Sequence, residues 1–314
     1  MAASSDTGSP SATPRVDLSV VISTHDRPRQ LREAIAAIEA QTHPGPIETI
    51  VVYDKAEPDP ELARDDERRP VRVLANDRTP GLPGSRNTGA AAARGEVLGF
   101  CDDDDLWLPQ KAARQLALLE RTHAATCTTG LEIVVDDRVV PRRGTDGLLT
   151  FVDLLRSRRV EAYMGTAVVR ADAFWGPIGP LDEDIPGGYA EDYDWLLRAA
   201  RHQAIVVDPE PLLQMRWIVQ SHFRDKWPDW EAALGLVLDR NPEFAGQPAG
   251  RARIEGQRAF AIAAQGRRGD AVRQVRTTLG WSWREPRGYL ALLVAGGIPS
   301  RWIVTALNRR GHGV

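Results

Sequence analysis

The sequence predicts an α/β fold built on a mainly parallel, doubly wound sheet, with a helical extension at the C-terminus. Short apolar, β-prone runs recur at residues 18–22, 50–53, 71–75 and 97–101, and helical segments follow the first and third of them. Such alternation of strands and helices is typical of a parallel sheet covered on both faces. Helical periodicity across residues 227–310 predicts the extension.

The first four strands are expected as follows. Residues 18–22 (LSVVI) form a continuous apolar run, which is typical of a strand buried on both faces. Pro28 suits the first turn of the helix that follows. The apolar face of that helix consists of Leu31, Ala34, Ile35 and Ile38. The strand at 50–53 ends at Asp54, the strand at 71–75 precedes an Ala-rich helix at 85–94, and the strand at 97–101 runs into Asp102.

The second half of the chain departs from this alternation. A helix at 109–121 precedes a hairpin, strands 132–136 and 138–140, that turns at Asp136-Asp137. We expect further strands at 164–170, 204–208 and 212–218, a Gly- and Pro-rich loop at 176–188 and a helix from about 192 to 201. Five helices close the chain: 229–239, 252–265, 269–279, 287–295 and 300–309. The chain therefore divides into a disordered leader (1–15), an α/β domain (16–225) and a helical region (226–314).

Composition bounds the class of protein. The chain has 314 residues, 42% hydrophobic and 26% charged, which is globular and excludes a mainly disordered chain. The only cysteines, Cys101 and Cys127, exclude a disulfide framework and favour a reducing, cytoplasmic location. The polar N-terminus lacks the apolar core of a secretory signal, and no run of 18 apolar residues predicts a membrane span.

Charge is unevenly distributed along the chain. Residues 1–250 carry 28 Lys and Arg against 40 Asp and Glu, a net charge of −12, whereas residues 251–314 carry 12 Arg against three acids, a net charge of +9. An apolar segment at 289–298 lies within this basic region. It is either an interfacial helix pair resting on anionic lipid, peripheral at the inner face of the cell membrane, or a helical cap on the α/β domain. We expect no nucleic-acid partner.

Acidic residues gather where the predicted strands end. Ligands of open parallel sheets bind beyond the carboxyl ends of the strands, and Asp26, Asp54 and the run 102–105 (DDDD) all lie there. Adjacent carboxylates raise one another's pKa, so a divalent cation is a natural partner, and oxygen ligands favour Mg²⁺ or Mn²⁺. Asp102 and Asp104 would point to one face if the chain stays extended. The alternative is an exposed acidic turn before the next helix.

Two further clusters are candidates for chemistry. Residues 191–195 (EDYDW) open a helix, and a carboxylate there is either a general base or a first-turn acid stabilised by the helix dipole. Arg86 follows the loop 81–85 (GLPGS), where glycines permit close approach to a phosphate; the alternative is an ordinary helix N-terminus. His222 is a candidate metal ligand or a structural histidine. The chain has neither GxxxxGK nor, after the first strand, GxGxxG, which argues against P-loop and Rossmann dinucleotide sites.

Five segments, taken in order, resemble motifs of the inverting family 2 glycosyltransferases, which have the GT-A fold. The segments are LSVVISTHDRP from Leu18, IVVYD at 50–54, SRNTGAAAARGEVLGFCDDDD at 85–105, IGPLDE at 178–183 and AEDYDWLLRAAR at 190–201. The resemblance spans about Leu18 to His222, two thirds of the chain. It implies a GT-A (Rossmann-like) catalytic domain at 16–225.

The resemblance also implies roles for individual residues. It implies that a pocket for the donor nucleotide, most simply a UDP-sugar, is lined by Thr24, Asp26, Asp54, Arg86, Asp102 and Asp103. Asp54 would accept a hydrogen bond from the pyrimidine N3–H. Asp104, the last residue of the DxD motif, would bind Mn²⁺ or Mg²⁺, and His222 would add a further contact. Tyr53 and Lys55-Ala56 depart from the family's DDGS motif, which leaves the base of the nucleotide open.

On the acceptor side, the resemblance implies that Asp192 deprotonates the acceptor hydroxyl, with Glu191 and Trp195 in the loop that contacts the sugars. The expected protein is therefore a metal-dependent, inverting glycosyltransferase acting on a glycan, lipid-linked or metabolite hydroxyl. The alternatives are a degenerate nucleotide-sugar-binding scaffold and a sugar-1-phosphate nucleotidyltransferase. The segment STHDRPRQ has no glycine, which argues against the latter.

Overall fold

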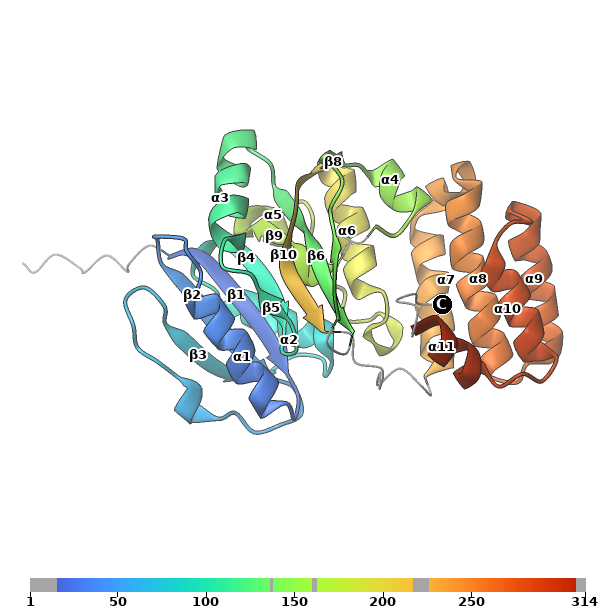
Figure 1. Ribbon diagram of the computed structural model, residues 1–314, viewed down its shortest axis with the longest axis horizontal. Helices are drawn as coiled ribbons and strands as arrows, with labels where there is room; N and C mark the ends of the chain where they lie inside the picture. Colours follow the sequence, from blue (N-terminus) through green and yellow to red (C-terminus); the bar gives the residue numbers. More distant parts are fainter. Residues whose placement is uncertain (1–15, 136–137, 160–162, 217–225, 309–314) are drawn as a thin grey trace, which may run out of the picture.

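The computed structural model describes residues 16–135, 138–159, 163–216 and 226–308. They form an α/β part with helices on both faces of one sheet and an adjoining all-helical part at the C-terminal end (Figure 1). The expected leader, residues 1–15, and His222 lie outside the described residues. Among the described helices, none has the length and hydropathy that spanning a lipid bilayer requires.

Within the described residues the sheet has ten strands, and its main path runs β3-β2-β1-β4-β9-β6-β10-β5. The strands are β1 (Val16–Thr24), β2 (Ile47–Tyr53), β3 (Val71–Ala75), β4 (Gly95–Asp102), β5 (Leu106–Trp107), β6 (Thr126–Val135), β7 (Arg138–Arg142), β8 (Gly147–Leu149), β9 (Val168–Arg170) and β10 (Ile205–Arg216). β3, β2, β1 and β4 are mutually parallel. β9 is antiparallel to both of its neighbours, and β6 and β7 form the expected hairpin. The sheet is therefore parallel in one half and mixed in the other.

Two strand predictions need correction. The expected strands at 204–208 and 212–218 belong to one strand, β10, because the chain stays paired with β6 through two register shifts around Pro211; residues 217 and 218 lie outside the described residues. Such irregularities let a strand tolerate proline, which breaks the pattern in the sequence. The expected strand at 164–170 is shorter, since Met164–Thr166 is a single 3₁₀ turn and only β9 is extended.

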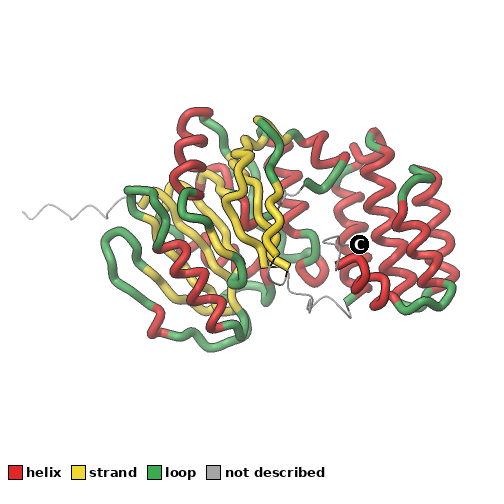
Figure 2. The backbone as a smooth tube through the Cα atoms, viewed as in Figure 1, coloured by secondary structure: helices red, strands yellow, loops and turns green. Residues whose placement is uncertain are grey.

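Alternating side chains of β1 supply two cores, one on each face of the sheet. Leu18, Val20 and Ile22 pack with α1 (Pro28–Glu39) and α3 (Lys111–Thr122). Val21 points the other way, into the core formed with α2 (Leu82–Ala92), α4 (Phe151–Arg156), α5 (Ala171–Trp175) and α6 (Glu191–His202). In Figure 2 helices flank the strands on both sides. The predicted doubly wound arrangement is thus confirmed.

The five helices expected at the C-terminus are present: α7 (Trp227–Arg240), α8 (Pro248–Ala264), α9 (Arg268–Trp281), α10 (Pro286–Ala295) and α11 (Ser300–Asn308). Leu234 and Val237 of α7 join the same core as α6. At Gly250 of α8 a Cβ atom would lie 1.8 Å from the carbonyl oxygen of Leu155, so this contact requires glycine. The helical part therefore packs directly on the α/β part, while a domain boundary at 225/226 stays a prediction.

Candidate active site

The ends of four parallel strands meet at one edge of the sheet. Thr24 pairs with Tyr53, Ser23 pairs with Asp102, and Tyr53 pairs with Ala75. The chain leaves β1, β2, β3 and β4 at the same level, so the polar residues that follow each strand become neighbours. This is the place where open parallel sheets bind ligands.

Asp54 is fixed at this edge by the loop that precedes α2. Its Oδ1 accepts hydrogen bonds from Asn76 Nδ2 at 2.9 Å and from the backbone N–H of Gly81 at 3.1 Å. Gly81 has a φ of 129°, which a side chain would disfavour. Among the described residues, the charged group nearest to Oδ2 is the Lys55 ammonium, 3.9 Å away. One carboxylate oxygen is thus anchored, and the other accepts no hydrogen bond from the described residues.

The aspartates after β4 lie in a turn, which corrects the expectation of an extended chain. Asp105 N donates to Asp102 O at 3.1 Å, so successive side chains point in different directions. Asp103 accepts from the Thr24 hydroxyl at 2.8 Å and from Arg27 at 2.9 Å, and Arg27 also donates to Asp104 at 2.6 Å. The turn is therefore tied to the end of β1, and the alternative of a freely exposed acidic turn is wrong.

A buried arginine links the two acidic clusters. The Arg86 side chain is 2% exposed, and its guanidinium donates to Asp102 at 2.7 Å and to Glu191 at 2.7 Å. Burial opposes the charge of Arg86, but the two carboxylates raise its pKa. The resemblance implied that Arg86 holds the nucleotide; in the structure it instead positions Asp102 and Glu191, because it is buried between them.

Tyr163 connects Asp102 to Asp105. Its hydroxyl lies 2.6 Å from Asp102 Oδ2 and 2.7 Å from Asp105 Oδ2. A hydroxyl has one proton, so one of these carboxyl groups must be the donor. Burial and the charge of Asp102 raise the pKa of Asp105 well above its usual value, which assigns the proton to Asp105. Burial would also raise the pKa of Asp102, but Arg86 and the Tyr163 hydroxyl outweigh it, and the pKa is lowered.

Glu191 and Asp192 begin α6 and have different surroundings. Burial, followed by the negative charge of Asp192, raises the pKa of Glu191 to about 7 despite Arg86. Asp192 Oδ2 accepts from Arg158 at 2.6 Å, and its Oδ1 accepts from the backbone N–H of Tyr193 at 2.7 Å. The side chain of Asp192 is 10% exposed and that of Arg158 is 43% exposed, so this pair lies at the surface of the site.

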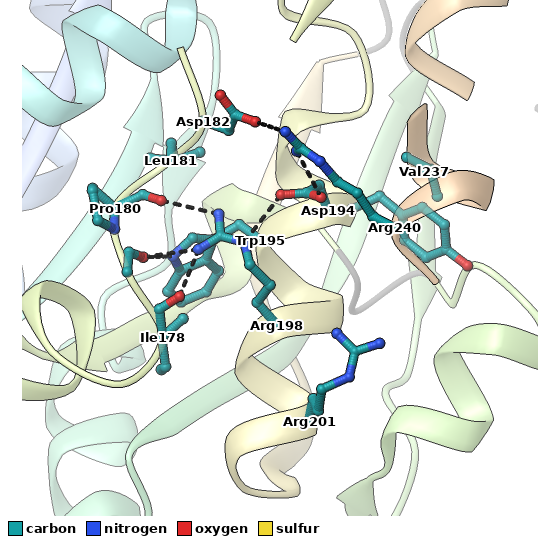
Figure 3. Close-up of polar contacts among 12 residues, drawn as sticks. Ile178, Pro180, Leu181, Asp182, Asp194, Trp195, Arg198, Arg201, Val237 and Arg240 are labelled. Carbon is teal, nitrogen blue, oxygen red and sulfur yellow. Dashed lines mark hydrogen bonds and ion pairs between the residues drawn. The ribbon is translucent and has the colours of Figure 1, made fainter. Parts of the chain in front are cut away.

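A network of arginines fixes the first turns of α6 (Figure 3). Arg198 bonds Asp194 at 3.1 Å and donates to the backbone carbonyls of Ile178 and Pro180. Arg240 reaches from α7 to both Asp182 and Asp194. The network joins α6 to the 178–182 segment and to the helical part, which holds Glu191 and Asp192 in place.

Trp195 is not part of the site surface, which corrects the expectation that it contacts a sugar. Its side chain is fully buried in the core beside Phe174, and its Nε1–H donates to Gly179 O at 3.0 Å. Trp195 lies one helical turn further into α6 than Glu191, and there the side chain packs in the core with Phe174. Trp195 therefore anchors the 178–182 segment from below.

The acidic turn fits a divalent cation by its chemistry. Among the described residues no three His, Cys, Asp or Glu side chains converge as a preformed cluster. Asp104 is nevertheless short of positive charge: burial and then Asp102 raise its pKa to about 6, although Arg27 opposes the shift. Mg²⁺ is commonly held by one or two carboxylates together with ligand phosphates, so a third protein ligand is not required. The guanidinium group of Arg27, which donates to Asp103 and Asp104, shows that positive charge is stabilised beside these two carboxylates.

The raised pKa of Asp104 predicts a stability effect in the absence of divalent cations. Above pH 6 the Asp104 carboxylate is ionised in the folded and in the unfolded chain, and its charge lowers the stability of the folded state. Below about pH 4 the carboxyl group is neutral in both states, and this loss of stability disappears. Asp104→Asn should therefore stabilise the protein at pH 7.5 by about 1–3 kcal/mol, and the gain should vanish as the pH falls towards 4. Urea denaturation in EDTA measures this, with Asp239→Asn on the exposed surface of α7 as the control. Lower stability of Asp104→Asn at pH 7.5 would contradict it.

Most of the predicted residues are joined by these contacts: Thr24, Arg86, Asp102, Asp103, Asp104, Glu191 and, next to it, Asp192. Asp26 lies at the rim, with a φ of 52° and a side chain 80% exposed. Sequence reasoning missed Asn76, Arg158 and Tyr163. They come from loops that carry no recognisable pattern, and only folding brings them to the site.

The comparisons with known proteins bear on this arrangement. The family described as "Glycosyl transferase family 2" matches residues 19–175, half of the chain. The chain belongs to this family. Among family 2 relatives, an uncharacterized glycosyltransferase of Nostoc sp. is 31% identical over 137 residues, which are 41% of this chain and 41% of that protein. The chain thus matches about two fifths of that relative's length.

Two further proteins are similar to this family 2 chain. The Escherichia coli protein named UDP-Glc:alpha-D-GlcNAc-diphosphoundecaprenol beta-1,3-glucosyltransferase WfgD is 25% identical over 87 residues, 28% of this chain and 34% of that one. The crystal structure of Staphylococcus aureus TarS 1-349 in complex with UDP-GlcNAc superposes with a TM-score of 0.62 at 16% identity, over 95% of this chain and 93% of that one. This likeness confirms the predicted GT-A fold.

Proposed function

We propose that the protein is an inverting glycosyltransferase that moves a sugar from a UDP-sugar to a hydroxyl group of its acceptor. The observation that carries the proposal is the Arg86 bridge, 2.7 Å from Asp102 and 2.7 Å from Glu191. It joins a carboxylate at the end of β4 to one at the start of α6, which supports a single site between them. A transferase needs both, the first near the leaving diphosphate and the second near the attacking hydroxyl.

We assign the nucleotide to the edge of the sheet at the ends of β1 and β2. Thr24 and Asp26 would line it, and the unanchored oxygen of Asp54 would accept the N3–H of uracil. A UDP donor is supported by the names of the two similar proteins, of which one uses UDP-Glc and the other was solved with UDP-GlcNAc. Asp103 would keep the end of β1 in position through its hydrogen bonds with Thr24 and Arg27.

Mn²⁺ or Mg²⁺ would be held by Asp104 together with the diphosphate of the donor. When bound, such an ion supplies positive charge that stabilises the departing diphosphate. Arg27 lies within 3 Å of both Asp103 and Asp104, so its positive charge would also balance part of the negative charge of these two carboxylates. His222 stays a proposed additional ligand, since it lies outside the described residues.

Asp192 is proposed as the general base. Its carboxylate is oriented by Arg158 and by the backbone of Tyr193, and it lies at the start of α6 with 10% of its side chain exposed. A base in this role takes the proton of the acceptor hydroxyl as the oxygen attacks the anomeric carbon, while the sugar–phosphate bond breaks on the opposite face. Glu191 is buried against Arg86 and would keep Asp192 in position.

A transfer assay tests this function. The protein is incubated with UDP-glucose, UDP-GlcNAc or UDP-galactose, Mn²⁺ and polyprenyl-diphosphate sugars or short glycans, and released UDP is measured. Proton NMR of the product then gives the anomeric configuration. Release of UDP with inversion supports the proposal. Tight UDP binding without any transfer would favour the scaffold alternative, and a retained configuration would contradict the role of Asp192.

We also propose peripheral contact with a membrane through α10 and α11. Six of the eleven large apolar side chains that are exposed in the described chain lie between residues 283 and 302: Trp283, Tyr289, Leu292, Leu293, Ile298 and Trp302. The opposite face of α10 packs Ala291 and Val294 against α8 and α9. Exposed aromatic side chains beside a region with a net charge of +9 suit an anionic lipid surface. A lipid-linked acceptor, as in the name of the Escherichia coli relative, would be reached there.

Changing two of these side chains should weaken the membrane contact. Leu293→Ser combined with Trp302→Ser should lower co-sedimentation with phosphatidylglycerol vesicles about tenfold, because each side chain loses apolar burial. Val139→Ser with Leu148→Ser, which changes exposed apolar residues of β7 and β8, is the matched control. Equal pelleting of both double variants and the wild type would return α10 and α11 to a purely structural role.

A further inference from the structure

Arg253, a half-buried arginine near the proposed base, has no carboxylate partner among the described residues. Arg253 of α8 donates through Nη2 to the Tyr193 hydroxyl at 2.9 Å. Its Nε is buried without a hydrogen-bond partner, and among the described residues no carboxylate lies within ion-pair distance of it. Buried guanidinium groups are normally paired, because an unpaired buried charge is costly. The lack of a carboxylate partner for Arg253, next to the proposed active site, suggests that an anion from outside the chain binds there.

Two more arginines approach the same place. The guanidinium carbons of Arg158 and Arg253 lie 5.9 Å and 5.4 Å from the centre of the Tyr193 ring. Arg287 of α10 packs against α8, where a Cβ at Gly256 would lie 2.9 Å from Arg287 Cβ, and its Nε is also buried without a partner. Burial lowers the pKa of Arg253, and although Tyr193 opposes the shift, the charges of Arg158 and Arg287 lower it further. The three cations are therefore electrostatic neighbours.

Two of these three arginines have a carboxylate partner in the part of the chain that the structure describes. Arg158 is paired with Asp192 at 2.6 Å, and Arg287 is paired with Glu285 at 2.8 Å. Among the described residues, Arg253 is thus the member of the three that has no carboxylate partner. A single negative charge would complete the cluster. Neighbouring guanidinium groups that come from different elements suit a phosphate, which accepts hydrogen bonds in several directions.

We infer that Arg158, Arg253 and Arg287 form a binding site for a phosphate group of the acceptor, beside the general base. The assignment to the acceptor rests on the proposed function, because Arg158 contacts Asp192, the residue that would receive the acceptor's proton. The acceptor would thus carry its phosphate close to the hydroxyl that becomes glycosylated. The site also gives the helical part a role in the reaction, since α8 and α10 supply two of its three arginines.

Titration of inorganic phosphate into the full chain, saturated with UDP and Mg²⁺, tests this site by calorimetry. We expect phosphate to bind while UDP is present, because the two sites are separate. Arg253→Gln should weaken phosphate binding about tenfold and leave UDP affinity within twofold of the wild type. Arg258→Gln is the matched control, since Arg258 lies on the same helix and also has a buried, unpartnered Nε but pairs with Glu255 at 3.1 Å.

Thermal melts establish that each variant folds. If Arg253→Gln does not fold, Arg253→Lys decides, because it keeps a positive charge but loses the planar fork, and it should weaken phosphate binding to a smaller extent. Phosphate binding that disappears when UDP is added would assign these arginines to the donor and overturn the inference. So would equal binding by the Arg253 and Arg258 variants. UDP binding tests the proposed function separately, so the two failures are distinguishable.

Discussion

Replacing Asp192 with Asn should lower kcat by about a thousandfold and leave the affinity for UDP unchanged. The amide keeps the size of the carboxylate and still accepts a hydrogen bond from Arg158, but it cannot take a proton. General-base catalysis typically contributes 10²–10⁴-fold, which sets the expected loss. Steady-state transfer measures kcat, and calorimetry with UDP measures the nucleotide affinity.

Asp184→Asn is the control for this variant. Asp184 is an exposed carboxylate of the segment that precedes α6, so its loss removes the same charge without touching the site. Transfer by Asp184→Asn should match the wild type. A turnover of Asp192→Asn within tenfold of the wild type would exclude Asp192 as the base and direct attention to Glu191.

Replacing Arg86 with Leu should cost about 3–5 kcal/mol of stability. The substitution leaves Asp102 and Glu191 without their shared cation, and breaking a buried ion pair by removing one partner typically costs this much. The pKa of Glu191, already raised to about 7 by burial and Asp192, should rise further once Arg86 is absent. Urea denaturation at pH 7.5 gives the loss.

A second substitution shows whether the loss of stability comes from the carboxylates of Asp102 and Glu191 that Arg86→Leu leaves without a partner. Adding Glu191→Gln to Arg86→Leu removes one of them and should recover part of the stability, whereas Glu191→Gln in the wild-type background should not increase stability by the same amount. A double-mutant cycle yields the coupling between Arg86 and Glu191. A coupling energy near zero would contradict the bridge on which the proposed function rests.

The strands and helices that position the site could be predicted because their signals are local. The buried run 18–22, the face of α1 and the spacing of the five C-terminal helices each follow from periodicity within one segment. The acidic ends of β2 and β4 could be predicted as well, since parallel strands align their carboxyl ends. The joining of β10 through Pro211 could not, because pairing with β6 overrides the local break.

The partners of the site residues were harder to predict. Arg86 was expected at a ligand, yet it lies between Asp102 and Glu191, which are separated from each other by 89 positions in the sequence. Trp195 shares a motif with Asp192, but its side chain is enclosed in the core beside Phe174. Such contacts depend on tertiary packing, and a single sequence holds no pattern that reveals them.

The most direct test of the central claim is calorimetric binding of UDP with Mn²⁺ and with EDTA, alongside dTDP, GDP and CMP. We predict that UDP binds in the presence of Mn²⁺, that EDTA weakens this binding, and that Asp104→Asn abolishes the dependence on metal. Preference for another nucleoside diphosphate would correct the donor and leave the site intact. Absence of binding by every nucleotide, in both conditions, would contradict the assignment of this strand edge as a nucleotide-sugar site.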